Sequence, residues 1–262
     1  MTLTLTSGVS RVAHRTTLAV LTAAALLAGC GTKDATAPLL PGLQGRIRLV
    51  NLITDTTRGR VNATVSSNAL GVNLVYGASG PSSLPTPTTS IYAPINTGAQ
   101  SIVMKRTIDT TVTVATFPVT VAANVDYTVY ATGGAGASAI ASFITADTNS
   151  VPATGAVRVR VVHLAPSAGN VDVFVTAVGA DLALAAPTLA NVPLRASAYL
   201  SVLAGTYQVR VVPAGTAAAL RAANVAINLA SVALPANGAR TIIAADNNVG
   251  GAPFRFIALV DR

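Results

Sequence analysis

His163 is the residue of this chain best suited to proton transfer, because imidazole is the side chain that titrates near neutral pH. Asp172 follows in the next predicted strand, and we expect its carboxylate to approach the imidazole across a hairpin. A His–Asp pair is half of a nucleophilic triad, with Ser167 and Ser197 as the nominal nucleophiles. No Gly-x-Ser-x-Gly motif accompanies either serine. These residues define one hypothesis, a hydrolase that uses His163 and Asp172.

A tandem duplication of the chain provides a control for that hypothesis. Three pairs of segments resemble one another in the same order: Arg46–Leu52 with Arg158–Leu164, Ala123–Ala131 with Ala236–Ala244, and Phe143–Asp147 with Ile257–Asp261. The offset between the members of a pair is nearly constant, at 112, 113 and 114 residues. Ordered anchors at a constant spacing are typical of an internal repeat.

The first repeat has amides where the second has the candidate acid–base groups. Asn51 aligns with His163, and Asn62 aligns with Asp172. An amide forms hydrogen bonds like a neutral imidazole, but it cannot transfer a proton. We therefore expect these four residues to be structural polar pairs that satisfy buried backbone groups, and we predict no catalytic residue.

Alternating residues indicate how each repeat begins. In VRVRVVHLAPSAGNVDVFV, residues 157–175, two alternating runs flank Pro166 and Gly169, which is typical of two strands joined by a short loop. The valines of the first run share one face, and Arg158 and Arg160 share the other. Arg46 and Arg48 repeat the pattern. We expect these arginines to coat solvent-facing sides of the strands.

The composition favours an all-β fold. Hydrophobic residues make up 51% of the 262 residues and aromatic residues only 4%, so Val, Ile, Leu and Ala must fill the cores. Val and Ile favour strands, while 21 Gly and 14 Pro supply turns. We predict two tandem antiparallel β-sandwich domains, immunoglobulin-like or transthyretin-like, at 46–147 and 156–262, joined by a linker at 148–155.

The N-terminal segment predicts export and lipid anchoring. Arg11 and Arg15 precede an apolar run, Leu18–Ala28, which is typical of a secretory signal and too short to span a bilayer. Residues 27–30, LAGC, resemble the lipobox of bacterial lipoproteins, and Cys30 is the only cysteine of the chain. This resemblance implies a signal peptide at 1–29 and a lipidated Cys30 that begins a flexible tether at 30–45. It also implies a cell-envelope location, at the outer membrane in a Gram-negative cell.

The distribution of charge and the small number of metal-binding side chains exclude several functions. The chain has 17 basic residues against 9 acidic ones, but the basic residues form no cluster interleaved with aromatics, so we expect no nucleic-acid partner. With one mature histidine, no glutamate and no free thiol, only Asp oxygens are left for a metal. We interpret Asp246–Asn248 as an Asx turn before the last strand and expect no metal and no cofactor.

The second repeat resembles a known bacterial family. Residues 159–175 are similar to the opening of the domain of unknown function 4397, which pairs an Arg-Val-x-His-x-(Ser/Ala)-Pro stretch with Val-Asp-Val-Tyr-Val. Gly205–Val209, GTYQV, is similar to a Gly-x-Tyr run of that family. The first repeat departs from the pattern at Asn51, Thr54 and Asn62. The resemblance implies an exported β-sandwich domain and no agreed activity.

These observations favour a non-catalytic cell-envelope lipoprotein with a structural or adhesive binding role. Its expected partners are the membrane, through Cys30, and a cell-wall or surface polymer or another envelope protein. One alternative is a module that binds glycans through exposed aromatics, for which the candidates are Tyr76, Tyr92, Tyr130 and Tyr199. The other alternative is the hydrolase with His163 and Asp172.

Overall fold

Most of the residues that the structure describes lie in β-strands, as the alternating Val, Ile and Thr residues predict. The structure is a computed structural model that describes residues 42–55, 60–81, 91–135 and 139–261. All of these residues belong to one compact unit. The predicted signal peptide, Cys30 and most of the predicted tether lie outside the described residues.

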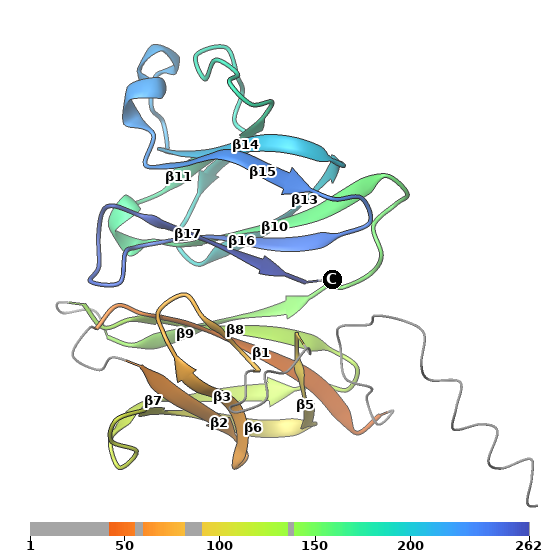
Figure 1. Cartoon of the computed structure of the whole chain (residues 1–262), viewed down its shortest axis with the longest axis vertical. Coiled ribbons are helices and arrows are strands. Elements are labelled where there is room, and N and C mark those ends of the chain that lie inside the picture. Colours follow the sequence, from red (N-terminus) through yellow and green to blue (C-terminus); the bar gives the residue numbers. More distant parts are fainter. Residues whose placement is uncertain (1–41, 56–59, 82–90, 136–138, 262) are drawn as a thin grey trace, which may run out of the picture. The chain divides into compact units, whose positions relative to one another are not determined.

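The first repeat is a sandwich of two sheets (Figure 1). The inner sheet, which packs against the other repeat, has the order β4-β1-β8-β9, with β5 also paired to β1. The outer sheet has the order β3-β2-β6-β7. The inner strands are β1 (Gln44–Ile53), β4 (Ser79–Gly80), β5 (Ala93–Asn96), β8 (Asp126–Gly133) and β9 (Ala141–Asp147). The outer strands are β2 (Val61–Val65), β3 (Asn68–Leu74), β6 (Gly98–Arg106) and β7 (Thr113–Val121).

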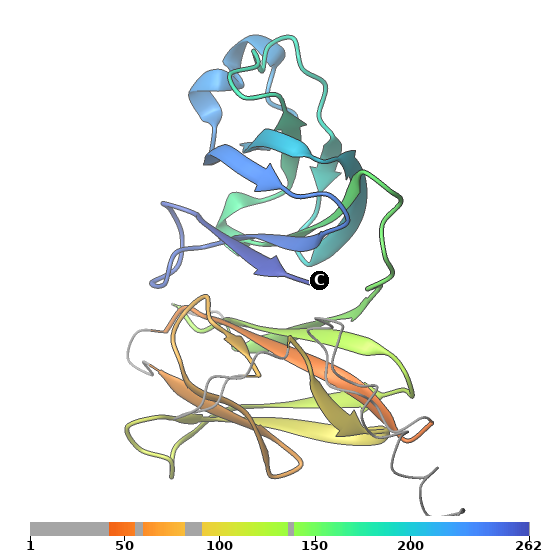
Figure 2. The same cartoon turned by 45° about the vertical axis from the view of Figure 1, so that its right-hand side comes forward.

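The second repeat has the same two-layer arrangement (Figure 2). Its inner sheet has the order β13-β10-β16-β17, and its outer sheet has the order β12-β11-β14-β15. The inner strands are β10 (Ala156–Leu164), β13 (Ala196–Leu203), β16 (Ala239–Ala245) and β17 (Arg255–Val260). The outer strands are β11 (Val171–Thr176), β12 (Leu189–Val192), β14 (Gly205–Pro213) and β15 (Ile227–Leu234). Short 3₁₀ turns occupy Pro166–Ala168, Ala218–Leu220 and Ala222–Asn224.

The fold is therefore all-β with two tandem sandwiches, as predicted. Most strand pairs are antiparallel, but each inner sheet contains one parallel pair, β1 with β8 and β10 with β16. These parallel pairs join the segments that the sequence identified as repeat anchors. β1 starts at Gln44, so the last two residues assigned to the tether pair with β5 instead.

The expectation of a hairpin between the first two strands of each repeat is wrong. β10 pairs with β13 and β16, whereas β11 pairs with β12 and β14. The turn at Pro166–Ala168 therefore carries the chain from the inner sheet to the outer sheet. Alternating residues define strands, but they do not define which strands pair, because pairing depends on partners far along the chain.

Each sandwich has its own apolar core between its two sheets. In the first repeat this core includes Ile47, Leu49, Val61 and Ile102. In the second repeat Val159, Val161, Val171 and Val209 take the corresponding places. A further buried cluster joins the opposite faces of the two inner sheets, and its members are Val50, Leu52, Tyr130, Val162, Leu164, Ile243, Ala245 and Leu259.

Because the inner sheets are covered on both faces, the expectation that Arg48 and Arg160 face solvent is wrong. Their side chains are only 2% and 1% exposed. A strand that is buried on both faces normally reads as a continuous apolar run. Here the arginines interrupt that run because they carry the contact between the two repeats.

The two repeats exchange buried ion pairs. Arg48 Nη2 of the first repeat lies 2.7 Å from Asp261 Oδ1 of the second. Arg160 Nη1 of the second repeat pairs with Asp147 Oδ1 of the first. Each arginine thus reaches the aspartate that ends the other repeat, so the contact is reciprocal.

A threonine of the same repeat supports each pair. Arg48 Nε donates to Thr128 Oγ1 at 3.1 Å, and Thr128 in turn donates to Asp147. Arg160 Nε donates to Thr241 Oγ1 at 3.0 Å, and Thr241 donates to Asp261 Oδ2 at 2.7 Å. Buried charges are tolerated only when such bonds satisfy their remaining polar atoms. The network is therefore a closed arrangement of charges and hydroxyls.

Asp147 shows the electrostatic consequence of this arrangement. Burial alone would raise the pKa of Asp147, but the hydrogen bond and charge of Arg160, with the bond from Thr128, outweigh burial and lower it. A carboxyl whose folded pKa is lowered stabilises the fold above its unfolded pKa, near 4. That contribution is lost as the pH falls through the folded pKa.

Replacing Arg48 with Met should destabilise the protein by about 3–5 kcal/mol, because Asp261 would be left buried without its cation. The free energy of unfolding in urea measures this change. Arg158→Met is the control, because Arg158 is only partly buried and donates to Thr148 and Ser150 of the linker. The control should cost about 1 kcal/mol or less. Equal losses in the two variants would contradict a special role for Arg48.

The difference in unfolding free energy between the wild type and Asp147→Asn should depend on pH. It should be largest at neutral pH, and it should shrink as the pH is lowered below about 4, because the wild-type carboxyl then gains a proton. Urea unfolding of both proteins between neutral pH and pH 2 tests this expectation. A difference that is constant over this range would show that Asp147 does not stabilise the fold as a carboxylate.

Candidate functional site

His163 lies at the end of β10 and is completely buried. Its Nε2 lies 2.7 Å from Gly169 O, which assigns the proton to Nε2, and the backbone N–H of Ala165 points to Nδ1 at 3.5 Å. Burial lowers the pKa of His163, against the smaller raising effects of the Gly169 carbonyl and the Asp246 charge. The imidazole is thus neutral at pH 7, and backbone groups occupy both of its nitrogens.

Asn51 also bonds to backbone groups in the first repeat, although the carbonyl that accepts from it belongs to a different segment of the repeat. Its Nδ2 donates to Leu74 O at 3.1 Å, and its Oδ1 accepts from Ile53 N at 3.2 Å. As at His163, the N–H that the side chain accepts comes from the residue two positions further along the chain. The amide and the imidazole therefore do the same local work of joining the end of an inner strand to neighbouring backbone.

Asp172 and Asn62 support a matching irregularity in the two outer sheets. Asp172 Oδ1 accepts from Asn191 N, and Asn62 Oδ1 accepts from Asn73 N, both at 2.8 Å. Asn191 and Asn73 have positive φ angles of 51° and 56° at register shifts in β12 and β3. Asn is one of the few residues that adopt this conformation readily. The side chain opposite each bulge thus satisfies an N–H that the ladder leaves free.

The structure does not bring His163 and Asp172 together as the predicted pair. They lie in different sheets, and each bonds to backbone of its own surroundings. Ser167 Oγ donates to Asp246 Oδ2 at 2.8 Å. Ser197 lies in β13, in register with Val162. A nucleophilic triad requires the serine to give its proton to the histidine. Here the Ser167 hydroxyl donates its hydrogen bond to a carboxylate, and the His163 N–H donates its hydrogen bond to a carbonyl.

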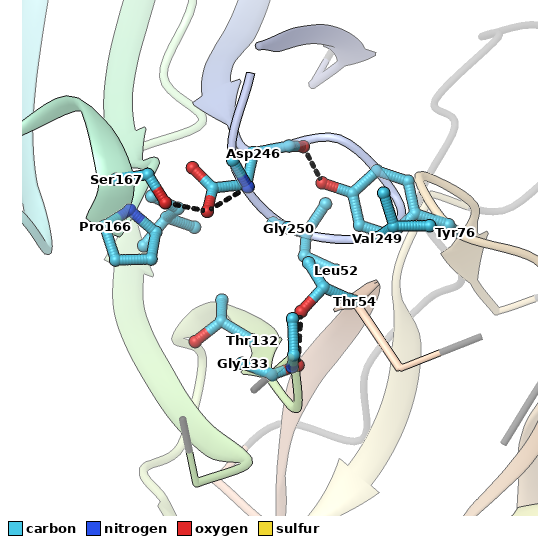
Figure 3. Close-up of a pocket in the computed structure, with 13 residues that line it drawn as sticks. Leu52, Thr54, Tyr76, Thr132, Gly133, Pro166, Ser167, Asp246, Val249 and Gly250 are labelled. Atoms are coloured by element: carbon cyan, nitrogen blue, oxygen red, sulfur yellow. Dashed lines mark hydrogen bonds between the residues drawn. The ribbon is translucent and has the colours of Figure 1, made fainter. Parts of the chain in front are cut away.

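A pocket of about 550 Å³ lies where strands of both repeats end (Figure 3). Its walls come from the ends of β1, β8 and β10, the 3₁₀ turn at Pro166–Ala168, and the loop after β16. The lining residues are Leu52, Thr54, Tyr76, Thr132, Gly133, Ala135, Leu164, Pro166, Ser167, Asp246, Val249, Gly250 and Gly251. Four of them, Leu52, Tyr76, Leu164 and Asp246, come from residues that sit at or beside the contact between the repeats.

The hydroxyl groups around the pocket donate their hydrogen bonds to acceptors of the protein. Thr54 Oγ1 donates to Gly133 O at 3.1 Å, and Thr132 Oγ1 donates to Ala141 O at 3.3 Å. Tyr76 donates to the carbonyl of Asp246, and Ser167 donates to its carboxylate (Figure 3). Because these protons are committed, the hydroxyl oxygens can offer only lone pairs to a molecule in the pocket.

Asp246 is the charged residue of the pocket lining. It is 4% exposed, and its Oδ2 accepts from Ser167 Oγ and from Gly251 N at 3.0 Å. Its Oδ1 has no hydrogen-bond partner among the described residues. Burial of a carboxylate oxygen without a donor is costly, so the carboxylate is the group here that would gain most from a ligand.

The loop after Asp246 forms the predicted Asx turn. Asn247 Oδ1 accepts from Val249 N, and Asn247 Nδ2 donates to Ala252 O. In the part of the chain that the structure describes, no group of three or more His, Cys, Asp or Glu side chains lies close enough to hold a metal ion.

The tyrosines do not form the exposed row that a sugar-binding face would need. Tyr92 and Tyr130 are completely buried, and Tyr76 is partly buried against the contact between the repeats. Tyr92 donates to Asp147 Oδ2 at 2.7 Å and lies 4.8 Å from the guanidinium of Arg48. Tyr199, at 41% exposed, is the most accessible of the four candidates. Tyr92 and Tyr130 are therefore unavailable to stack on a sugar ring.

Reasoning from the sequence missed the pocket and the role of Asp246. The duplication contained a signal, because Asp246 stands where the first repeat has Gly133: Leu164 pairs with Ala245, and Leu52 pairs with Thr132. A carboxylate present in one repeat only is not needed to build the sandwich. The alignment of the two repeats shows this difference between Asp246 and Gly133, but it does not show that the repeats contact one another.

His163→Asn should leave the fold intact, because an amide can both donate to a carbonyl and accept from a backbone N–H, as Asn51 does with Leu74 O and Ile53 N in the first repeat. We expect a loss of about 1 kcal/mol or less in unfolding free energy. His163→Leu, which leaves both backbone groups buried without partners, should cost about 2–5 kcal/mol. Thermal and urea unfolding of the two variants distinguish these outcomes. Loss of the cooperative transition in His163→Asn would contradict the structural role.

One family model matches a segment of the chain that includes the first repeat and the start of the second. A family model described as a domain of unknown function (DUF4397) matches residues 45–174. The match begins in β1, passes through the first repeat and ends within β11 of the second. No match to a curated protein is found.

Proposed function

Because the chain is a DUF4397 domain-containing protein, and that description assigns no activity, we propose its function from its own residues: a non-catalytic binding protein of the bacterial cell envelope, anchored by lipid on Cys30. The pocket between the repeats is its binding site. The observation that carries the proposal is that both repeats contribute walls to one pocket, at the end of the contact that their ion pairs join.

The geometry of the candidate catalytic groups supports binding rather than catalysis. His163 is neutral, buried and held by backbone, so it is unsuited to general acid–base work. Ser167 donates to the Asp246 carboxylate and not to His163, so the serine–histidine bond of a nucleophilic triad is not formed. The hydrolase that combines His163 with Asp172 is disfavoured by the same geometry, because the two side chains serve separate sheets.

Envelope anchoring is supported by the order of residues at the start of the chain. A basic pair, an apolar run and a small-residue stretch precede the one cysteine, as expected for lipid attachment. Several acyl chains on one cysteine would give stable anchoring where a single chain would be marginal. Among the described residues, no helix has the length and apolar character needed to cross a membrane.

A glycan or cell-wall polymer is the second candidate for the ligand, and one feature favours it. The outer sheet of the first repeat carries an open groove of about 640 Å³ lined with hydroxyl, amide and amine groups, including Thr64, Ser66, Gln100, Ser101 and Lys105. Such groups can bond to sugar hydroxyls. The groove contains no aromatic residue for a sugar ring to stack on, so the pocket between the repeats remains the better site.

Cys30→Ser tests the anchor directly. Cells that express the wild type should incorporate a labelled fatty acid into the protein and retain it in the membrane fraction, because the acyl chains supply the binding energy. Cys30→Ser should carry no label and should lose its retention after salt washing. Thr32→Ser, a change close to the cysteine that leaves it intact, is the control and should behave as the wild type. A labelled Cys30→Ser protein would exclude Cys30 as the lipid-bearing residue.

A further inference from the structure

The pocket between the repeats contains a negative charge that the protein leaves uncompensated. Three other buried or nearly buried carboxylates face arginines: Asp126 pairs with Arg46, Asp147 with Arg160, and Asp261 with Arg48. Asp246 has no such ion pair among the described residues, although it is 4% exposed. Asp172, another buried aspartate without an ion pair, accepts a backbone N–H and is not part of the pocket lining.

The surroundings of Asp246 supply no cation. The pocket lining includes no lysine or arginine. His163, whose pKa the Asp246 charge acts on, stays neutral because burial dominates. Arg255, whose charge reaches Tyr76, and Arg195, in the wall of the adjoining pocket, both have exposed side chains. A buried carboxylate in this position gains from a positive charge that arrives from outside.

The remaining groups of the pocket define what that charge should be attached to. Thr54, Thr132, Tyr76 and Ser167 give their hydroxyl protons to protein acceptors, so they favour a ligand that donates hydrogen bonds. The side chains of Leu52, Leu164, Val249 and Pro166 provide apolar wall. A pocket of about 550 Å³ holds more than a single ion, since small-molecule sites are typically about 300–1,000 Å³.

We propose that this pocket binds a small organic ammonium ion, a molecule with a primary amine on a short hydrocarbon body. The ammonium group donates to the Asp246 carboxylate and to the lone pairs of Ser167, and the hydrocarbon lies against Leu52 and Leu164. The inference rests on the proposed binding function and names the ligand class for the same site. The first repeat supports it, because Gly133 occupies the position of Asp246 there and the sandwich forms without a carboxylate.

The test uses the protein purified from membranes of expressing cells in a non-ionic detergent. Isothermal titration calorimetry compares cadaverine, a diamine, with 1,5-pentanediol, which has the same carbon chain without charge. The wild type should bind cadaverine more than about tenfold more tightly than the diol, because the diol cannot pair with Asp246. Asp246→Asn, which keeps the shape of the side chain, should weaken cadaverine binding by more than about tenfold.

Asp109→Asn is the matched control, because Asp109 is an exposed aspartate in the turn before β7. It should bind cadaverine as the wild type does. If Asp246→Asn fails to fold, the comparison of diamine with diol on the wild type still decides. Equal affinity for the two probes, or no binding of cadaverine at millimolar concentrations, would overturn the proposal. Displacement of cadaverine by potassium or calcium ions at Asp246 would also overturn it, in favour of an inorganic cation site.

The outcomes separate this inference from the proposed function. If cadaverine does not bind while Cys30 is lipidated and His163→Asn stays folded, the ligand class is wrong and the anchored, non-catalytic protein stands. If cadaverine binds but Cys30→Ser retains its lipid label, the ligand class stands and the anchor is wrong.

Discussion

The exchange of buried charges between the repeats is the constraint on which the rest of the structure depends. Arg48 and Arg160 each leave their own repeat to meet the aspartate that closes the other one. Removing ions from water is costly, and a buried pair of this kind often adds little net stability compared with apolar residues. Its clearest effect is on the specificity of the packing between the repeats. Any shift of one inner sheet along the other would leave charges buried without partners in an apolar layer.

The network and the pocket are consequences of the same stacking of inner sheets. Along β1 and β10 the arginines come first, then Val50 and Val162, and then Leu52 and Leu164. The contact between the repeats therefore changes from charged to apolar, and then opens into the pocket where the strands end. The ion pairs hold the walls of the pocket in register, although they do not touch it. This arrangement suits a site whose walls must be held in a fixed geometry.

The sequence predicted what depends on local pattern and on the repeat. Alternation of Val with polar residues predicted the strands, and the alignment of Asn51 with His163 led to the expectation of a structural role. Both side chains bond to backbone groups in the structure. It did not predict what depends on contacts between distant segments. Arg48 and Arg160 were expected in solvent, because strand alternation cannot show that a second sandwich covers their face. Asp246 was assigned to a turn, which is correct, but its place in a pocket depends on both repeats.

A double-mutant cycle on Arg160 and Asp147 tests the central claim most directly. Arg160→Met, Asp147→Leu and the double variant are compared with the wild type by urea unfolding at neutral pH. A buried reciprocal contact predicts a coupling energy of about 2 kcal/mol or more. The loss of unfolding free energy in the double variant should then be smaller than the sum of the losses in the two single variants. Losses that simply add, with no coupling beyond about 0.5 kcal/mol, would show that the two repeats are not joined through these charges.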